Sequence, residues 1–252
     1  MLDDHEALTS ARIAYSYAPF RLVRAEALKA DAELFGESVK IAGPTLYSKA
    51  GFSGYSSSDL DQYHFSLLRS AIDEDVLLGV ASVMFWGFAQ GKDRFTTARA
   101  LSRAKHVGGL GKRSADAPTH IVRVVRTFSA FLDAGDRVQA LSEAMSLKHF
   151  GLAFASKLLA FASPDTECVY DEVISLRLRA SNDARLRALY VPTVGMHRLA
   201  EKASAYEGWA KLCTEKAAEL NHEKRRWKDW DGTEREWRAV DVERAFFSLG
   251  RD

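Results

Sequence analysis

A short glycine-containing segment near the middle of the chain has the residue types that can bind a phosphate group. The run from Leu147 to Ala155 (LKHFGLAFA) places a tight connection, closed by Gly151, between two helical patterns. Glycine suits a position where the backbone must approach another group closely or take a positive φ angle. The amides of such a connection, and the positive end of the helix that follows, can hold a phosphate oxygen. The segment therefore predicts a helix, a hairpin and a second helix that contacts phosphate.

Asp171 and Lys157 are the residues near this segment with the best chance of taking part in a reaction. Asp171 follows a short extended run at 168–170, and Lys157 lies four residues, or one helical turn, after Ala153. Each residue also has a simpler interpretation. Asp171 is a favoured N-cap for a helix that begins at Glu172, and capping is compatible with a second role. Lys157 either points toward the cleft beside Ala153 or lies in solvent.

The same segment resembles the helix-hairpin-helix DNA glycosylases, and within them the bacterial proteins with an 8-oxoguanine-glycosylase-like fold. The family motif runs apolar-Pro-Gly-apolar-Gly-x-Lys-x-Ala, and an Asp follows further along the chain. Leu147 and Phe150 fill the apolar positions, Gly151 is the second glycine and Ala155 is the alanine. Asp171 lies 18 residues after the lysine position, which is the family's spacing.

The sequence departs from the family motif at two places. Lys148 and His149 replace the Pro-Gly of the hairpin, which alters the main-chain site for a phosphate and a monovalent cation. The lysine that forms a Schiff base in bifunctional members is Ala153, which has no nucleophile. The resemblance therefore implies a monofunctional hydrolase. In such an enzyme Asp171 stabilises an oxocarbenium-like transition state and orients the attacking water, and Lys157 is the second catalytic candidate.

The resemblance implies an all-α, two-lobed helix-hairpin-helix DNA glycosylase fold. It is most specific over residues 137–180 and extends over 75–250. We expect a single helical unit over 1–252. It comprises an N-terminal helical and loop segment (1–74), a lobe with the helix-hairpin-helix at 137–171 (75–194), and C-terminal helices that complete the other lobe (195–252).

Residues 92–126 form the most basic stretch of the chain, with nine Lys and Arg residues against two Asp. Because the net charge of the whole chain is only +1, any attraction for nucleic acid has to come from a local surface. Lys112 and Arg113 from this stretch, with Lys148, His149 and Gly151 from the hairpin, are the predicted nucleic-acid-binding residues. The alternative interpretation is a solvated loop with basic flanks.

A glycosylase has to stack the extruded base on an aromatic ring. Phe128 and Trp209 are the candidates for this ring, and the alternative for both is a place in the hydrophobic core.

The composition excludes several other classes of protein. The 252 residues are 47% apolar and 27% charged, which is typical of a folded domain rather than a disordered or fibrous chain. Cys168 and Cys213 lie too far apart for a metal knuckle or an iron–sulfur loop, and the histidines show no metal-binding spacing. We therefore expect no resident metal or cofactor apart from a monovalent cation at the hairpin. The acidic N-terminus and the short apolar run at 76–89 predict a cytoplasmic protein without a membrane span.

Periodicity predicts a mainly helical chain with almost no strand pairs. The expected helices are 21–35, closed by Gly36; 60–71, capped by Ser58 or Asp59; one from Asp73 or Asp75 to about 87; 137–146; 152–161; one from Asp171 to 179; and most of 195–250.

Two functions remain open from the sequence. The first is hydrolysis of the N-glycosidic bond of a modified or damaged nucleobase, in DNA or in a related nucleobase-containing substrate. The second is a catalytically inactive nucleic-acid-binding or complex-forming relative. The runs at 155–161, 170–173 and 238–244 are similar to a bacterial branch found beside antiviral-defence genes, which implies protein partners from such an operon and no membrane partner.

Overall fold

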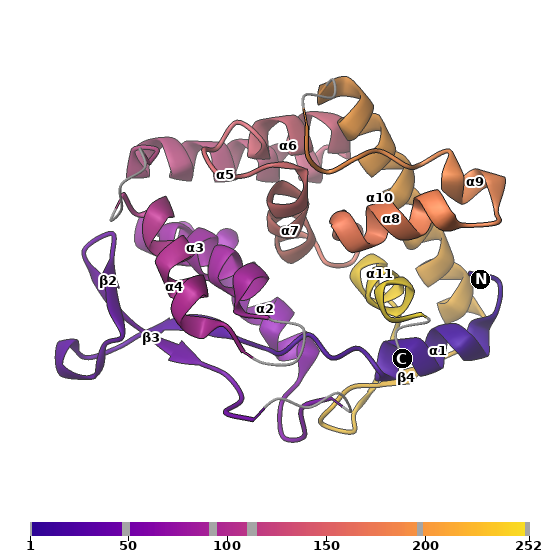
Figure 1. The fold of residues 1–252 in the computed structure, drawn as a ribbon, viewed down its shortest axis with the longest axis horizontal. Helices are drawn as coiled ribbons and strands as arrows, with labels where there is room; N and C mark the ends of the chain where they lie inside the picture. Colours follow the sequence, from indigo (N-terminus) through magenta and orange to yellow (C-terminus); the bar gives the residue numbers. More distant parts are fainter. Residues whose placement is uncertain (1, 47–50, 91–94, 110–114, 196–198, 250–252) are drawn as a thin grey trace.

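The computed structural model describes residues 2–46, 51–90, 95–109, 115–195 and 199–249 (Figure 1). The helices are α1 (His5–Ile13), α2 (Ser57–Leu68), α3 (Asp73–Ala89), α4 (Thr97–Val107), α5 (Pro118–Asp133), α6 (Arg137–Ala144), α7 (Leu152–Ala162), α8 (Glu172–Ala180), α9 (Ala184–Arg187), α10 (Leu199–His222) and α11 (Ala239–Ser248), with a 3₁₀ turn at Ala27–Lys29. The strands are β1 (Arg21–Arg24), β2 (Ala32–Leu34), β3 (Glu37–Ala42), β4 (Trp227–Lys228) and β5 (Glu234–Arg235).

The mainly helical class predicted from the sequence is confirmed. Helix α3 lies at the centre of the fold. Three acidic residues, including Asp73, start α3, which favours a helix because they face the positive end of its dipole. The rest of α3 is apolar on almost every side, and α2, α4, α5 and α7 all pack against it. A helix that is apolar on every side is typically buried in the centre of the core. Within the described residues, no helix has both the length and the apolar character needed to cross a membrane.

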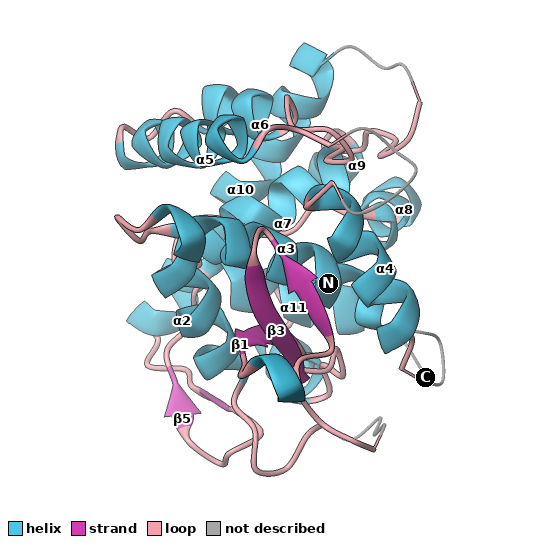
Figure 2. Cartoon of the chain, turned by 90° about the vertical axis from the view of Figure 1, so that its left-hand side faces the viewer, coloured by secondary structure: helices cyan, strands magenta, loops and turns pink. Residues whose placement is uncertain are grey.

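The helix expected over 21–35 is wrong, because this segment forms an antiparallel sheet with strand order β1-β3-β2 (Figure 2). Phe35 and Gly36 both have positive φ angles and form the tight turn between β2 and β3, where Leu34 pairs with Glu37. Such a turn is typical of a two-residue hairpin, so Gly36 closes a hairpin and not a helix. Leu22, Leu34 and Val39 are buried in a core cluster that also contains apolar residues of α3 and α4.

The segments around the predicted hairpin fold as expected. The helices predicted at 137–146, at 152–161 and after Asp171 are α6, α7 and α8. The helix predicted at 60–71 is α2, but its cap is Ser56, whose hydroxyl accepts a hydrogen bond from the amide of Asp59. In the last third, α10 and α11 are helical as predicted, whereas β4 and β5 form a short antiparallel ribbon between them.

A network of buried charges joins α1, α2 and α11. Arg12 of α1 donates two hydrogen bonds to Asp241 of α11, at 2.9 and 3.0 Å. Arg244 of α11 donates to both carboxylate oxygens of Asp61 of α2, and Arg238 donates to the same carboxylate at 2.7 Å. Asp61, Asp241 and both Arg12 and Arg244 are almost fully buried. Since a buried charge without its partner is strongly unfavourable, these pairs fix the position of α11.

Removal of one carboxylate from this network should destabilise the protein. Asp61→Asn should lower the free energy of unfolding by about 3–5 kcal/mol, because Arg244 then stays charged and buried without its counterion. Urea unfolding followed by circular dichroism measures the change. Asp59→Asn is the matched control, because Asp59 lies on the same helix but is exposed, and it should shift the value by no more than about 0.5 kcal/mol. A loss below about 1 kcal/mol for Asp61→Asn would contradict this account of the network.

Candidate active site

The predicted hairpin connects α6 to α7 and is held by the segment before α5. The amide of Phe150 donates to the carbonyl of Leu147 at 3.2 Å, which closes the turn. The backbone amide of Lys148 donates to Asp116 at 2.7 Å, and the Lys148 ammonium donates to the carbonyl of Ala115 at 3.1 Å. Lys148 and His149 are both exposed, as the sequence predicts for the tip of the hairpin.

The left-handed backbone position of the hairpin is His149 and not Gly151. His149 has a φ of 71°, whereas Gly151 has a φ of −76°, so of the two interpretations of Gly151, a close approach or a positive φ, the positive φ is wrong. Positive φ angles disfavour most side chains, and His is among the residues enriched there. His149 occupies the place of the first glycine in the motif, so the turn is kept with a different residue. Gly151 is the N-cap of α7, and the space where a Cβ would stand is open.

Lys157 and Asp171 come together in the structure. The Nζ atom of Lys157 lies 3.3 Å from Oδ2 of Asp171. The other carboxylate oxygen, Oδ1, accepts hydrogen bonds from the amides of Val173 and Ile174, so Asp171 is also the N-cap of α8. The Lys157 side chain is only 6% exposed and that of Asp171 is 18% exposed. Lys157 is therefore not a solvated lysine, and Asp171 is the more accessible member of the pair.

Ser156 fixes the segment that places Asp171 next to Lys157. Its hydroxyl oxygen accepts a hydrogen bond from the amide of Tyr170 at 2.9 Å, and the Tyr170 hydroxyl donates to the carbonyl of Leu189 at 2.7 Å. Both side chains are buried. Because Ser156 and Lys157 are adjacent in α7, and Tyr170 and Asp171 are adjacent in the following segment, one hydrogen bond aligns the pair.

One aromatic ring lies beside the Lys157 ammonium, and a second ring stacks on the first. Phe154, one turn earlier in α7, has its ring centre 5.5 Å from Nζ of Lys157. Phe154 stacks on Phe88 with ring centres 4.7 Å apart, and both rings are only partly buried. Gly87 allows this packing, because a Cβ there would come within 2.5 Å of the Phe154 ring. The sequence analysis did not identify Phe154 or Phe88, since apolar residues on a helix give no signal that distinguishes a site from a core.

Phe128 and Trp209, the rings proposed from the sequence for base stacking, both lie in the core and are fully buried. Trp209 also donates its indole N–H to the carbonyl of Val169 at 3.0 Å. Neither ring is brought to the Lys157–Asp171 pair.

Glu243 of α11 is a third ionisable residue, and it interacts electrostatically with this pair. It is 4% exposed. Burial and the negative charge of Asp171 raise the pKa of Glu243 to about 8, although Arg244, Lys157 and the Val169 backbone act in the opposite direction. The sequence gives no distinct signal for Glu243, because Asp241 and Arg244 lie in the same run, 239–247, and none of the three was interpreted as part of a site.

A basic face of α4 lies next to the hairpin. The rings of His106 and His149 are 6.3 Å apart, and the Arg103 guanidinium lies over Phe88 at 5.4 Å. Within the described ranges, no ion pair involves Arg99, Arg103 or Lys148. Arg123 and Arg126, from the same basic stretch, are paired with Glu143 and Asp73. Lys112 and Arg113 lie outside the described residues, so their predicted role stays a prediction.

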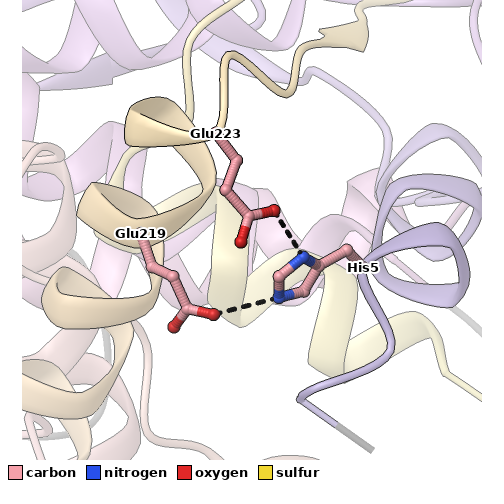
Figure 3. A group of neighbouring side chains, drawn as sticks. All are labelled: His5, Glu219 and Glu223. Carbon is pink, nitrogen blue, oxygen red and sulfur yellow. Dashed lines mark hydrogen bonds and ion pairs between the residues drawn. The ribbon is translucent and has the colours of Figure 1, made fainter.

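One group of side chains in the described residues has donor atoms close enough together to bind a metal ion: His5, Glu219 and Glu223 (Figure 3). Nδ1 of His5 faces Glu223 at 2.9 Å and Nε2 faces Glu219 at 3.1 Å, so each carboxylate contacts a different ring nitrogen. Glu219 is also paired with Lys216 at 2.7 Å. This arrangement suits a tether between α1 and α10. A metal bound by one ring nitrogen would need both carboxylates close to that same nitrogen.

A pocket of about 400 Å³ lies away from these residues, where β5 and the start of α11 meet α2. It is lined by Ser58, Asp165, Arg235, Glu236, Trp237 and Arg238. Its two arginines are already paired with Asp231 and Asp61, and none of the predicted site residues reaches it.

The binding of a monovalent cation at the hairpin stays a prediction. Hydrolysis of a glycosidic bond by a fixed carboxylate does not require this cation.

The geometry described so far is that of a helix-hairpin-helix followed by a capping Asp, in a mainly helical fold. The family model for 8-oxoguanine DNA glycosylase OGG-like proteins matches residues 65–247, which is well over half of the chain. This chain belongs to that family, and the resemblance stated from the sequence is confirmed at this level. Neither the curated proteins nor the solved structures contain a match to the chain.

The unpaired cations of α4 and the hairpin should contact DNA phosphates. Each lost phosphate contact reduces the slope of log affinity against log salt concentration by about 0.9 for duplex DNA. Replacing Arg99, Arg103 and Lys148 with Ala should therefore flatten the slope by about 2–3 units, as measured by fluorescence anisotropy with a labelled duplex.

Arg123→Ala/Arg126→Ala is the matched control for this experiment. Both residues lie in the same basic stretch but are engaged with acidic side chains, so the slope should hardly change. Equal effects of the two sets of variants would show that general charge, and not this face, attracts the DNA.

Proposed function

We propose that this protein hydrolyses the N-glycosidic bond of a damaged or modified base in DNA, as a monofunctional glycosylase. The observation that carries the proposal is the Lys157–Asp171 pair, in which a partly exposed carboxylate is held by a buried ammonium and two backbone amides. Family membership supports a glycosylase-type function, and the basic face beside the hairpin supports a DNA substrate.

In the proposed reaction, the bond between the sugar C1′ and the base nitrogen breaks, and a water molecule adds to C1′. Positive charge develops on the sugar in the transition state, and a fixed carboxylate beside it stabilises that charge. Asp171 supplies this carboxylate. Because three donors already hold Asp171 in place, little reorganisation is needed when the charge develops.

Lys157 acts in this proposal by holding Asp171 and not as a nucleophile. Position 153, where a bifunctional member has its lysine, is Ala. The Lys157 amine is engaged with Asp171 and buried, so it is not free to attack the sugar. Phe154, stacked on Phe88 and next to Lys157, is the proposed ring for the extruded base, in place of Phe128 and Trp209.

The second candidate is a catalytically inactive DNA-binding protein. The observations in its favour are Ala153 and the replacement of the hairpin Pro-Gly by Lys148-His149. Protein partners from a bacterial antiviral-defence operon belong to either candidate and stay a prediction. The two candidates differ in one observable, which is the release of a free base.

Asp171→Asn should abolish base release, reducing the single-turnover rate constant by about 10³-fold or more. The amide oxygen can still cap α8, so the free energy of unfolding should fall by only about 1–3 kcal/mol, which reflects the lost partner of Lys157. Chromatographic detection of the free base from duplexes with 8-oxoguanine or other modified bases measures the rate.

Asp136→Asn separates capping from catalysis. Asp136 caps α6 by accepting a hydrogen bond from the amide of Gln139 at 3.0 Å, and it has no contact with Lys157. This variant should release base at the wild-type rate. Asp171→Ser, which caps without a charge, should be as inactive as Asp171→Asn. Wild-type activity in either Asp171 variant would remove Asp171 from the reaction.

A monofunctional enzyme leaves no Schiff base to reduce. Incubation of the wild type with substrate and borohydride should therefore give no covalent protein–DNA adduct on a denaturing gel. An adduct that forms with the wild type and disappears in Lys157→Arg, which keeps the charge, would identify Lys157 as a nucleophile. That result would replace the monofunctional mechanism with a bifunctional one.

A further inference from the structure

A chain of ion pairs with alternating charge holds the N-terminal end of α1 on α10. Successive members lie 2.7–3.8 Å apart, measured between their charged atoms, and in spatial order they are Arg185, Asp3, Lys216, Glu219, His5, Glu223 and Arg225. His5 is the central member of this chain. It is also the one member whose residue type usually changes charge near neutral pH, because the others are carboxylates, a lysine and arginines.

Both nitrogens of the His5 ring face a carboxylate (Figure 3). Nδ1 lies 2.9 Å from Glu223, and Nε2 lies 3.1 Å from Glu219. A neutral imidazole carries a single N–H, so one of its nitrogens would present a lone pair to a carboxylate oxygen, which is repulsive. The protonated ring donates from both nitrogens and satisfies both carboxylates. The geometry therefore fits the positively charged form of His5 and not the neutral one.

The charged groups around His5 favour this form. The hydrogen bond and the charge of Lys216 lower the pKa of Glu219, and His5 acts in the same direction, so Glu219 is an anion. On α1 itself, Asp4 is committed to capping the helix through the amide of Ala7, and Glu6 is exposed. The elements that pack against α1 are α11 and β4. In the described part of the chain, none of their charged residues forms an ion pair with His5: Lys228, Asp241, Glu243 and Arg244.

The contacts of His5 are important because of what α1 carries at its other end. Arg12, two turns after His5, forms the buried hydrogen bonds to Asp241 that hold α11. The His5 and Arg12 contacts therefore fix opposite ends of one short helix. A helix end without contacts opens at little cost in free energy. If the His5 contacts are lost, the N-terminal end of α1 should open first.

We propose that His5 is a pH-sensitive clamp, which holds the N-terminal end of α1 on α10 while its ring is protonated and releases it when the ring loses its proton. Histidine usually changes charge between pH 5 and pH 8. The unfolded chain does not hold these carboxylates against the ring, so only the folded state gains from the protonated ring. The stabilisation is therefore present at low pH and is lost as the pH rises. This inference does not depend on the proposed glycosylase activity.

Hydrogen–deuterium exchange of the α1 amides tests the clamp. At about pH 5.5 the wild type should protect these amides about three- to tenfold more than His5→Gln does, because each partly exposed ion pair contributes modestly. At about pH 8.5 the two proteins should exchange equally. Comparing the proteins at the same pH removes the intrinsic pH dependence of exchange, and EDTA in the buffer removes any contribution from a bound metal ion.

Two further variants separate the charge of the ring from other effects. His5→Lys keeps a positive charge at both pH values, so its α1 protection relative to the wild type should increase at the higher pH. His222→Gln is the matched control, because His222 is an exposed histidine at the end of α10 that forms no ion pair in the described residues. It should behave as the wild type at both pH values.

The melting temperature should follow the same pattern. The wild type should exceed His5→Gln by about 2–4 °C at the lower pH and by less than about 1 °C at the higher pH. The state of the ring can also be read in the wild type by NMR of its nitrogens, which are both of the N–H type only in the protonated form.

Three results would overturn the proposal. Equal protection of α1 in the wild type and His5→Gln at the lower pH would show that His5 does not hold this helix. A wild-type advantage that stays the same at the higher pH would show that the contacts do not need the proton. A neutral His5 ring at the lower pH, seen in the nitrogen spectrum, would contradict the charged form on which the clamp depends.

Discussion

The arrangement of the site depends on the buried ion pairs that hold α11 against α1 and α2. Arg12 and Arg244 have their charges deep inside the protein, and Asp241 and Asp61 are the carboxylates that make this possible. Burial alone would raise the pKa of Asp241, but the arginines around it outweigh burial and hold its pKa well below the ordinary value. The stabilisation that Asp241 provides is therefore present above its ordinary pKa and is lost only under strongly acidic conditions. With α11 fixed in this way, the amides of Ala239 and Val240 at its start donate to the carbonyls of Asp165 and Pro164, in the segment that leads from α7 to Asp171.

Two carboxyl groups on α11 have surroundings that shift their pKa values in opposite directions. Guanidinium groups around Asp241 lower its pKa, whereas burial and the charge of Asp171 raise the pKa of Glu243. The ion pairs of Asp241 stabilise the fold. The contact between Lys157 and Asp171 positions α8 on α7 and also places a carboxylate at the more exposed side of the pair.

Local patterns in the sequence were sufficient to predict α6, α7 and α8, because helical periodicity and capping residues lie within a few positions of each other. Asp171 and Lys157 were each identified from the sequence as candidates, but the ion pair between them was not, because it depends on how α7 packs against the segment before α8. The sheet of β1, β2 and β3 was missed because its strands are short, and because Gly36, the glycine of a hairpin, also suits the end of a helix. The pKa shift of Glu243 could not be found from the sequence, since it arises from burial and from the charge of Asp171, which lies more than 70 positions away. For the same reason Phe154 could not be told apart from Phe128, which packs in the core.

The central claim is that this member of the OGG-like family removes a base from DNA and leaves the strand intact. The most direct measurement is mass spectrometry of a modified-base duplex after incubation with an excess of the wild-type protein. The account predicts free base and an equal amount of abasic site in an unbroken strand. Tight binding of the same duplex with every base still attached, at all pH values at which the protein is folded, would contradict it.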